Sequence, residues 1–241
     1  LILAAFRAGI RPAMVPAMNW RSNGRRPENF YFFRDSNGLW ENYNVEDVAT
    51  IEGWWRNRAL VLEFYNQRRA ELATKKPNKA HKLIAELEKE YDVTVVTQNI
   101  DNLHEQGGST KVIHLHGEST KVRPEDAAQD CKTIDVGYKP VNLGDTDSRG
   151  VQLRPNIVWF GEAVPKFDTA AHIASQADIM LIVGTSLQVY PAAGLVQYAK
   201  PGIPVYLIDP KPLNLHLPGV VQITDVATSG MERFIELLKN A

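Results

Sequence analysis

Helical and strand-like hydrophobic patterns alternate along the chain from about residue 79. Between residues 79 and 91, apolar side chains recur at three- and four-residue spacing among charged ones, which predicts an amphipathic helix. The β-branched run at residues 93–96 predicts a buried strand. Later segments repeat the pattern, with helices near 168–176, 192–199 and 231–239 and strands at 179–183 and 205–208. This alternation predicts an α/β fold with a doubly wound parallel sheet covered on both faces.

Two segments interrupt the alternation. Residues 36–76 are rich in aromatic and long polar side chains, and a helix is predicted at 56–72. Residues 118–150 are mostly charged or turn-forming, which predicts a loop-rich module. We expect the two segments to form a smaller lobe over the cleft of the main domain. That main domain is expected to be Rossmann-like and to comprise residues 1–35, 77–117 and 151–241.

Polar or small residues follow three of the predicted strands. Gln98 to Asp101, Gly184 to Ser186, and Asp209 occupy these positions. Turn formation explains any one of them. Ligands of parallel sheets, however, bind beyond the carboxyl ends of the strands, and three such ends together predict a nucleotide cleft. Gly184, Thr185 and Ser186 offer backbone N–H groups and hydroxyls to phosphate oxygens.

Composition narrows the classes of function. The 241 residues carry a net charge of −1, which gives no general electrostatic basis for binding nucleic acid or an anionic membrane. Cys131 is the only cysteine, which excludes an intramolecular disulfide and a zinc site built from cysteine pairs. We therefore expect no metal site and a cytoplasmic protein. The arginine-rich, acid-poor residues 1–34 leave an organelle transit peptide as an alternative.

A set of motifs in a fixed order resembles the sirtuins, the NAD-dependent protein lysine deacylases. The signature is Thr97-Gln98-Asn99-Ile100-Asp101-Asn102-Leu103-His104 with Gly107, followed by His114-Leu115-His116-Gly117. Further matches are Phe33-Arg34-Asp35 with Gly38-Leu39-Trp40, the stretch from Arg154 to Glu162, and Gly184-Thr185-Ser186-Leu187. The resemblance covers residues 33–241, and the ordered set is more specific than any single motif.

The resemblance implies a reaction and its central residues. Sirtuins cleave the nicotinamide–ribose bond of NAD while the acyl oxygen of a modified lysine attacks the ribose, giving nicotinamide, free lysine and O-acyl-ADP-ribose. His116 matches the general base that deprotonates a ribose hydroxyl, a task that suits the ordinary pKa of imidazole. Asn99, also expected to be catalytic, and Asp101 match the nicotinamide pocket, where an amide and a carboxylate pair with the carboxamide. The alternative for these residues, and for Asp101 in particular, is helix capping and turn formation after the strand.

Other positions match the rest of the cofactor site. Gln98 is expected near the ribose. Phe33 is expected to shield the reacting ribose, with core packing as its alternative, and Arg34 follows it in the same motif. Gly184, Thr185 and Ser186 match the cofactor-binding turn, and Asp209 stands where the family usually places Asn to contact the adenosine.

The acyl-lysine protein or peptide is the partner that the resemblance implies. Val158, Phe160, Gly161 and Glu162 are expected to border its channel, where an extended peptide adds as a strand. We expect structural roles for His104 and His114, and neither nucleic acid nor membrane as partner.

Residues 1–32 depart from the family pattern. They contain Ala8-Gly9-Ile10 but no Gly-Ala-Gly loop to cradle the pyrophosphate, and Phe32 replaces the usual Thr. Arginine side chains in this stretch are alternative phosphate donors. The cysteine pairs that hold zinc in many members are also missing, as in zinc-free bacterial ones. An impaired NAD or ADP-ribose binding module and a mono-ADP-ribosyltransferase are therefore the alternative functions.

Overall fold

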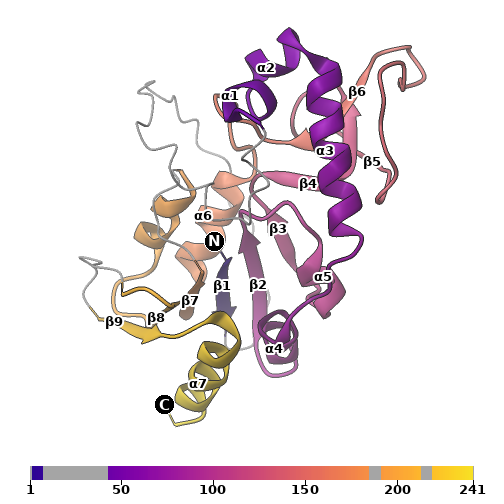
Figure 1. The fold of residues 1–241 in the computed structure, drawn as a ribbon. Coiled ribbons are helices and arrows are strands. Elements are labelled where there is room, and N and C mark those ends of the chain that lie inside the picture. Colours follow the sequence, from indigo (N-terminus) through magenta and orange to yellow (C-terminus); the bar gives the residue numbers. More distant parts are fainter. Residues whose placement is uncertain (1, 8–42, 185–190, 213–218, 241) are drawn as a thin grey trace.

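A computed structural model describes residues 2–7, 43–184, 191–212 and 219–240, in which a large and a small lobe can be followed in Figure 1. The helices are α1 (Val45–Val48), α2 (Ile51–Arg56), α3 (Arg58–Leu72), α4 (Lys79–Leu87), α5 (Leu103–Gly107), α6 (Phe167–Gln176), the 3-10 helix η2 (Ala192–Tyr198) and α7 (Ala227–Lys239). The strands are β1 (Ile2–Arg7), β2 (Asp92–Thr97), β3 (Val112–His114), β4 (Gly117–Pro124), β5 (Ile134–Asp135), β6 (Leu153–Ile157), β7 (Ile179–Val183), β8 (Val205–Asp209) and β9 (Val220–Thr224). Within these residues, no helix has the length and apolar character needed to span a membrane.

The large lobe is built on a six-stranded sheet with the order β3-β2-β1-β7-β8-β9. Strands β2 and β3 pair in parallel, as do β7, β8 and β9, which confirms the predicted parallel arrangement for these five. Strand β1 is the exception, because it runs antiparallel to both β2 and β7. Prediction of a wholly parallel sheet is therefore wrong at β1. An apolar central strand satisfies its hydrogen bonds in either direction, so its sequence does not encode the direction.

Alternate residues of each strand face opposite sides of this sheet. One side, packed under α4 and α7, contains Val93, Val95, Leu181, Val183, Tyr206 and Ile208. The other side, packed under α6 and η2, contains Val96, Met180, Ile182, Val205 and Leu207. The strands are thus buried on both faces, which explains their uninterrupted apolar sequences and confirms the doubly wound architecture.

The small lobe joins helices α1 to α3 to a second sheet with the order β5-β4-β6. Its core includes Trp54, Phe64, Tyr65 and Trp159. The prediction that residues 118–150 are loop-rich is wrong for β4, although residues 136–150 contain neither a helix nor a strand of the sheet. Strand β4 was not apparent from hydrophobicity, because its buried positions include Ser119, Thr120 and Arg123. Strand β6 pairs with β4, although the sequence grouped residues from 151 onward with the main domain.

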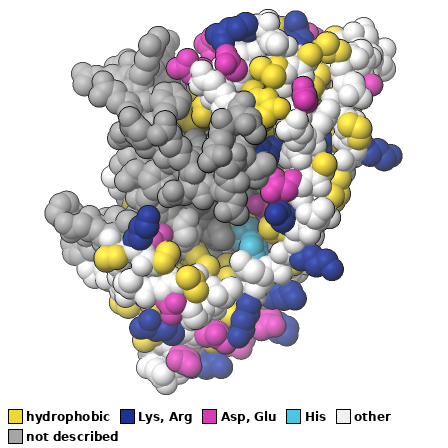
Figure 2. Space-filling model, in the orientation of Figure 1, with side chains coloured by type: hydrophobic (Ala, Val, Ile, Leu, Met, Phe, Trp, Pro, Cys, Tyr) yellow, Lys and Arg dark blue, Asp and Glu magenta, His cyan; other side chains and the backbone are white. Residues whose placement is uncertain are grey.

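Charged side chains are distributed without a dominant sign on the face shown in Figure 2. Lysine and arginine side chains alternate there with aspartate and glutamate side chains, over both lobes. The distribution agrees with the net charge of −1. Among the described residues of this face, lysine and arginine therefore form no extended basic surface of the kind that binds a nucleic-acid backbone.

Gly230 sets the approach of α7 to the sheet. It is buried in the helix, and a Cβ atom at this position would lie 2.3 Å from Cγ2 of Ile208. Ile208 is itself 1% exposed and β-branched, so its methyl group has no free rotamer to move into. The helix therefore tolerates the lower helix propensity of glycine in exchange for close packing.

We predict that Gly230→Ala lowers the free energy of unfolding by about 1–2 kcal/mol, because overpacking outweighs the better helix propensity of alanine. Urea unfolding measures the change, with Glu236→Ala on the exposed side of α7 as the control. A stability equal to or above that of the wild type would show that α7 moves away at little cost.

Candidate functional site

Three predicted site segments meet at one edge of the large sheet. Asn99 follows β2 and Gly184 follows β7, and both line a cavity of about 170 Å³. Asn78 and His81 of α4 and Ala227 of α7 complete much of its wall. Gly184 has a φ of +62°, which favours glycine, and its N–H donates to the carbonyl of Ile208, next to Asp209. The cavity thus lies beyond strand ends on either side of β1, as expected for a doubly wound sheet.

Several predicted residues cannot be placed. Phe33, Arg34, Thr185 and Ser186 lie outside the described residues. Asp209 is half-buried at the end of β8, and its carboxylate accepts a hydrogen bond from the Lys211 N–H at 2.8 Å. This bond shapes the turn after β8 and occupies one oxygen of the two.

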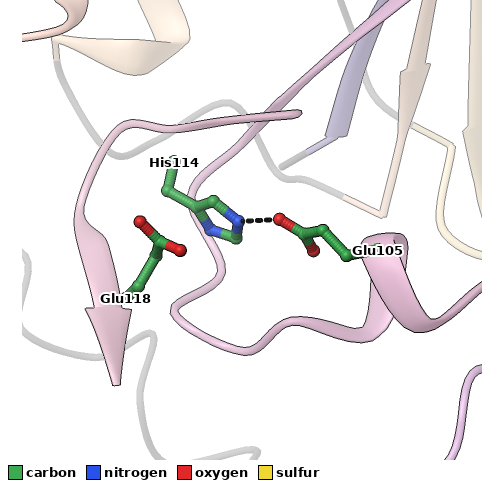
Figure 3. Close-up of side chains that lie close together, drawn as sticks. All are labelled: Glu105, His114 and Glu118. Carbon is green, nitrogen blue, oxygen red and sulfur yellow. Dashed lines mark hydrogen bonds and ion pairs between the residues drawn. The ribbon is translucent and has the colours of Figure 1, made fainter. Parts of the chain in front are cut away.

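A buried histidine lies beside the cavity-lining turn (Figure 3). His114 Nε2 is 2.8 Å from a carboxylate oxygen of Glu105, and its Nδ1 is 3.1 Å from the backbone carbonyl of Asn99. Burial alone lowers the pKa of His114, but its bonds to Glu105 and Asn99 outweigh burial, so the pKa is raised. The pKa of Glu105 is lowered although burial opposes this, because of the bond to His114. The two form an ion pair when His114 is protonated.

Glu118 lies close to this pair. Its carboxylate, the carboxylate of Glu105 and the imidazole of His114 each offer one atom that could bind a metal, and these atoms lie within 4.8 Å of one another. Each member already has a protein partner, since Glu118 is 2.8 Å from Lys121 Nζ. The group is therefore a satisfied charge cluster, and it supplies no reason to assign a metal. The expectation of no metal site stays a prediction.

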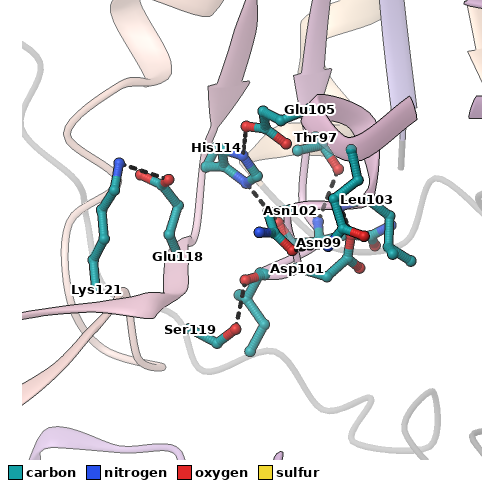
Figure 4. Close-up of polar contacts among 12 residues, drawn as sticks. Thr97, Asn99, Asp101, Asn102, Leu103, Glu105, His114, Glu118, Ser119 and Lys121 are labelled. Carbon is teal, nitrogen blue, oxygen red and sulfur yellow. Dashed lines mark hydrogen bonds and ion pairs between the residues drawn. The ribbon is translucent and has the colours of Figure 1, made fainter. Parts of the chain in front are cut away.

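The turn after β2 is fixed by backbone hydrogen bonds (Figure 4). The Asn99 N–H donates to Thr97 Oγ1 at 3.0 Å, and Asp101 Oδ1 accepts from the Leu103 N–H at 3.0 Å. Ser119 donates through both its N–H and its hydroxyl to the Ile100 carbonyl. Asp101 thus makes the turn-forming bond to the N–H two residues on, whereas the N-cap of α5 is Asn102, which has no side-chain capping bond. Asn99 remains exposed at the cavity.

His116 lies between the two sheets, after β3 and directly before β4. Its ring has a hydrogen bond with the backbone of Gln98, and its carbonyl accepts from the Val158 N–H at 3.0 Å. Burial lowers the pKa of His116, against the bond to Gln98, which raises it. The imidazole is therefore neutral at physiological pH and able to accept a proton.

Gly117 brings β4 and β6 into close contact beside His116. Its φ is +81°, and a Cβ atom here would lie 1.9 Å from the Asn156 carbonyl oxygen. Only glycine fits both the conformation and the space. The position of His116 is therefore tied to the strand that leads into residues 158–162.

Residues 158–162 leave β6 and pass α1. The Phe160 N–H donates to the Ala49 carbonyl at 3.0 Å, and Gly161 is exposed with a φ of +88°. The Glu162 carboxylate accepts from both terminal nitrogens of Arg154 and from the Trp159 N–H. The Glu162 carboxylate is thus hydrogen-bonded within the protein, whereas Val158 and Phe160 are half-buried at the surface of the segment.

Comparison with known proteins decides the family. Residues 30–191 match the Sir2 family. The chain belongs to the Sir2 family. It is 51% identical over 210 residues to an NAD-dependent protein deacylase of Bacteroides thetaiotaomicron, covering 86% of this chain and 90% of the relative. A deacylase of the same description from Helicobacter pylori is 50% identical over 201 residues, covering 83% and 86%.

Solved Sir2 structures share the fold. A Sir2 homologue in complex with NAD superposes with a TM-score of 0.75 at 32% identity, covering 86% of this chain and 82% of the homologue. A structure of Sir2 with a p53 peptide and NAD+ has a TM-score of 0.65 at 27% identity, covering 80% and 82%.

Contacts across the chain reveal supporting roles, in this Sir2 protein, that the sequence did not assign to the residues concerned. Glu105 and Ser119 fix the turn after β2, yet neither belongs to a recognisable local pattern. Arg154, 2% exposed, lies with its guanidinium 3.5 Å from the centre of the Trp159 ring. Such long-range pairings leave little signal in a single sequence.

His104 has the structural character expected of it, because it is fully buried. Both its ring nitrogens lack hydrogen-bond partners among the described residues. Burial, with a smaller contribution from His81, lowers the pKa of His104 to about 4. The ring of His81 lies 4.7 Å away, between His104 and the cavity that His81 lines.

We predict that Gly117→Ala costs about 2–4 kcal/mol of unfolding free energy, because the new methyl group meets backbone that cannot rotate away. The matched control is Gly144→Ala, which has a φ of +92° but nothing within 4 Å of the added carbon. We expect the control to cost about 1 kcal/mol from the backbone conformation alone. Urea unfolding of both variants measures the difference, and equal losses would refute the close approach of β4 and β6.

Proposed function

We propose that this chain is an NAD-dependent protein lysine deacylase that transfers the acyl group of a modified lysine to ADP-ribose and releases nicotinamide. The observation that carries the proposal is the joint placement of Asn99 and Gly184 on one cavity, with His116 bonded to the Gln98 backbone in the adjoining turn. The named activity of the similar deacylases supports the same reaction.

The residues at the cavity fit NAD. Asn78 and Ala80 belong to the amino end of α4, and Ala227 begins α7, so the partial positive charges of two helix ends lie at one cavity. Small side chains at Ala80, Gly184 and Ala227 leave room for a pyrophosphate there. The exposed amide of Asn99 offers a donor and an acceptor to the nicotinamide carboxamide. Bound NAD supplies the nicotinamide–ribose bond that the reaction breaks.

His116 has the properties of the general base. Its lowered pKa keeps the imidazole neutral at physiological pH, ready to accept the proton of a ribose hydroxyl. The hydrogen bond to the Gln98 backbone orients the ring. Anchoring of its carbonyl by the Val158 N–H keeps the base at a fixed distance from the proposed peptide segment.

We propose that the acyl-lysine peptide binds along residues 158–162 as an added strand. Val158 and Phe160 would contact the lysine chain, and exposed Gly161 lets a peptide backbone approach closely. Glu162 would act through Arg154 and the Trp159 N–H, by holding the segment in shape. The lobe of residues 36–76 and 118–150 would cover the cleft from one side.

The proposed setting of this reaction is the cytoplasm. Cys131 is half-buried and is the only cysteine, so the fold depends on no disulfide. A fold that needs no disulfide suits a reducing compartment.

Nicotinamide release from NAD tests the function, with acetyl-, succinyl- and longer acyl-lysine peptides as substrates. We predict peptide-dependent release that His116→Ala reduces by about 100-fold or more, because a general base contributes 10²–10⁴-fold. His172→Ala on α6 is the control and should keep full activity. Binding of NAD without any release would contradict the deacylase and favour an impaired binding module, and transfer of ADP-ribose to a protein in place of deacylation would favour the transferase.

In the same assay, activity should decrease only at acidic pH. The proposed base works only when neutral, and its pKa lies below the ordinary value of about 6.5. We predict that kcat/KM is flat near pH 7 and falls as the pH decreases through that lowered pKa. An acid limb above pH 7 would contradict the assignment of His116.

A further inference from the structure

One buried imidazole connects the two segments that carry the proposed chemistry. His114 ends β3, where it pairs with Thr97 of β2, and it stands two residues before His116. Its side chain, 2% exposed, reaches the backbone carbonyl of Asn99 on one side and Glu105 of α5 on the other.

The bond to the Asn99 carbonyl completes the fixation of that residue. Its N–H is already held by Thr97 Oγ1, so both backbone groups of Asn99 have partners. With both groups held, the backbone of Asn99 has little freedom to rotate, which fixes the direction in which its side chain leaves the backbone. That side chain is the one at the cavity.

We propose that His114 and Glu105 are positioning residues for the nicotinamide end of the cofactor site. By holding the Asn99 carbonyl, the pair aims the Asn99 amide at the carboxamide without touching the cofactor. The inference rests on the proposed function, because it needs NAD in the cavity. His114 and Glu105 are not among the residues that the sequence predicted to bind the cofactor.

The two hydrogen bonds of His114 determine which protonation state of the ring can hold the Asn99 carbonyl. The Asn99 carbonyl and the Glu105 carboxylate are both acceptors, and neutral imidazole has only one N–H to donate. Both bonds therefore need the imidazolium. Glu105 and His104 on α5 and Glu118 on β4 are the titratable groups that face it, and Lys121 pairs with Glu118. The raised pKa of His114 agrees with this form.

The arrangement has a consequence for pH. As the pH rises through the pKa of His114, one N–H is lost and the two acceptors compete for the other. Affinity for NAD should then fall on the alkaline side. ADP-ribose lacks nicotinamide, so its affinity should not follow.

Calorimetric binding of NAD and of ADP-ribose to the whole protein tests the proposal without requiring turnover. Glu105→Gln removes the charge that favours the imidazolium, and Glu105 is 40% exposed, so the fold should tolerate the change. We expect NAD affinity to start falling at a lower pH than in the wild type, which gives about tenfold weaker NAD binding between the pKa values of His114 in the two proteins, with wild-type affinity at more acidic pH and unchanged ADP-ribose binding throughout. His114→Gln should weaken NAD binding across this pH range.

Glu88→Gln is the matched control. Glu88 is also a surface glutamate that accepts hydrogen bonds, from the N–H and hydroxyl of Thr110, but it does not contact the turn. It should bind both ligands like the wild type.

Four outcomes separate the possibilities. Parallel loss of NAD and ADP-ribose affinity in Glu105→Gln would show a general structural role and overturn the proposal, and so would no loss of NAD affinity. If the wild-type protein binds NAD but releases no nicotinamide with any peptide, the proposed deacylase activity is refuted. The change in NAD affinity relative to ADP-ribose affinity in the variants still tests the positioning role of His114 and Glu105. A wild type that binds neither ligand would overturn both.

Discussion

The close approach of Gly117 to the Asn156 carbonyl fixes the point where the chain passes from the large sheet into the small one. A left-handed glycine lets β4 leave β3 and pair at once with β6, with Gly117 opposite Ile157. His116 is consequently held between a carbonyl–amide bond to Val158 and a ring contact with Gln98. The positions of the proposed base His116, of the turn after β2 and of the segment beyond β6 all depend on this junction.

Buried charges beside the junction are paired with one another. Arg154 and Arg123, each about 2% exposed, face the Glu162 carboxylate, and Arg154 also lies over the Trp159 ring. Removing one member of such a group leaves its partner uncompensated, which is costly in a buried setting. The group therefore gives the surface segment at 158–162 a rigid base, and it explains why an acidic side chain stands there without facing solvent.

The sequence predicted the elements whose signal is local. Strands β2, β7 and β8 are continuous apolar runs, and the polar residues directly after them, including Asn99 and Gly184, lie at one edge as expected. Strand β4 was missed because it buries polar side chains, and the direction of β1 has no sequence signature. The link from His114 to Glu105 joins separate elements, so no periodicity could reveal it. The sequence therefore predicted the position of the candidate site, but not the hydrogen-bond network that supports it.

Residues 125–152 form an excursion whose two ends are fastened together. Pro124 pairs with Leu153, and the Glu125 N–H donates to the Gln152 carbonyl at 2.9 Å. Because the excursion starts and finishes at the same point of the sheet, changes in its length or composition need not shift β4 or β6. The loop residues between the two fastened ends can therefore be lengthened or shortened while β4 and β6 stay paired, and the geometry at Gly117 and His116 is kept.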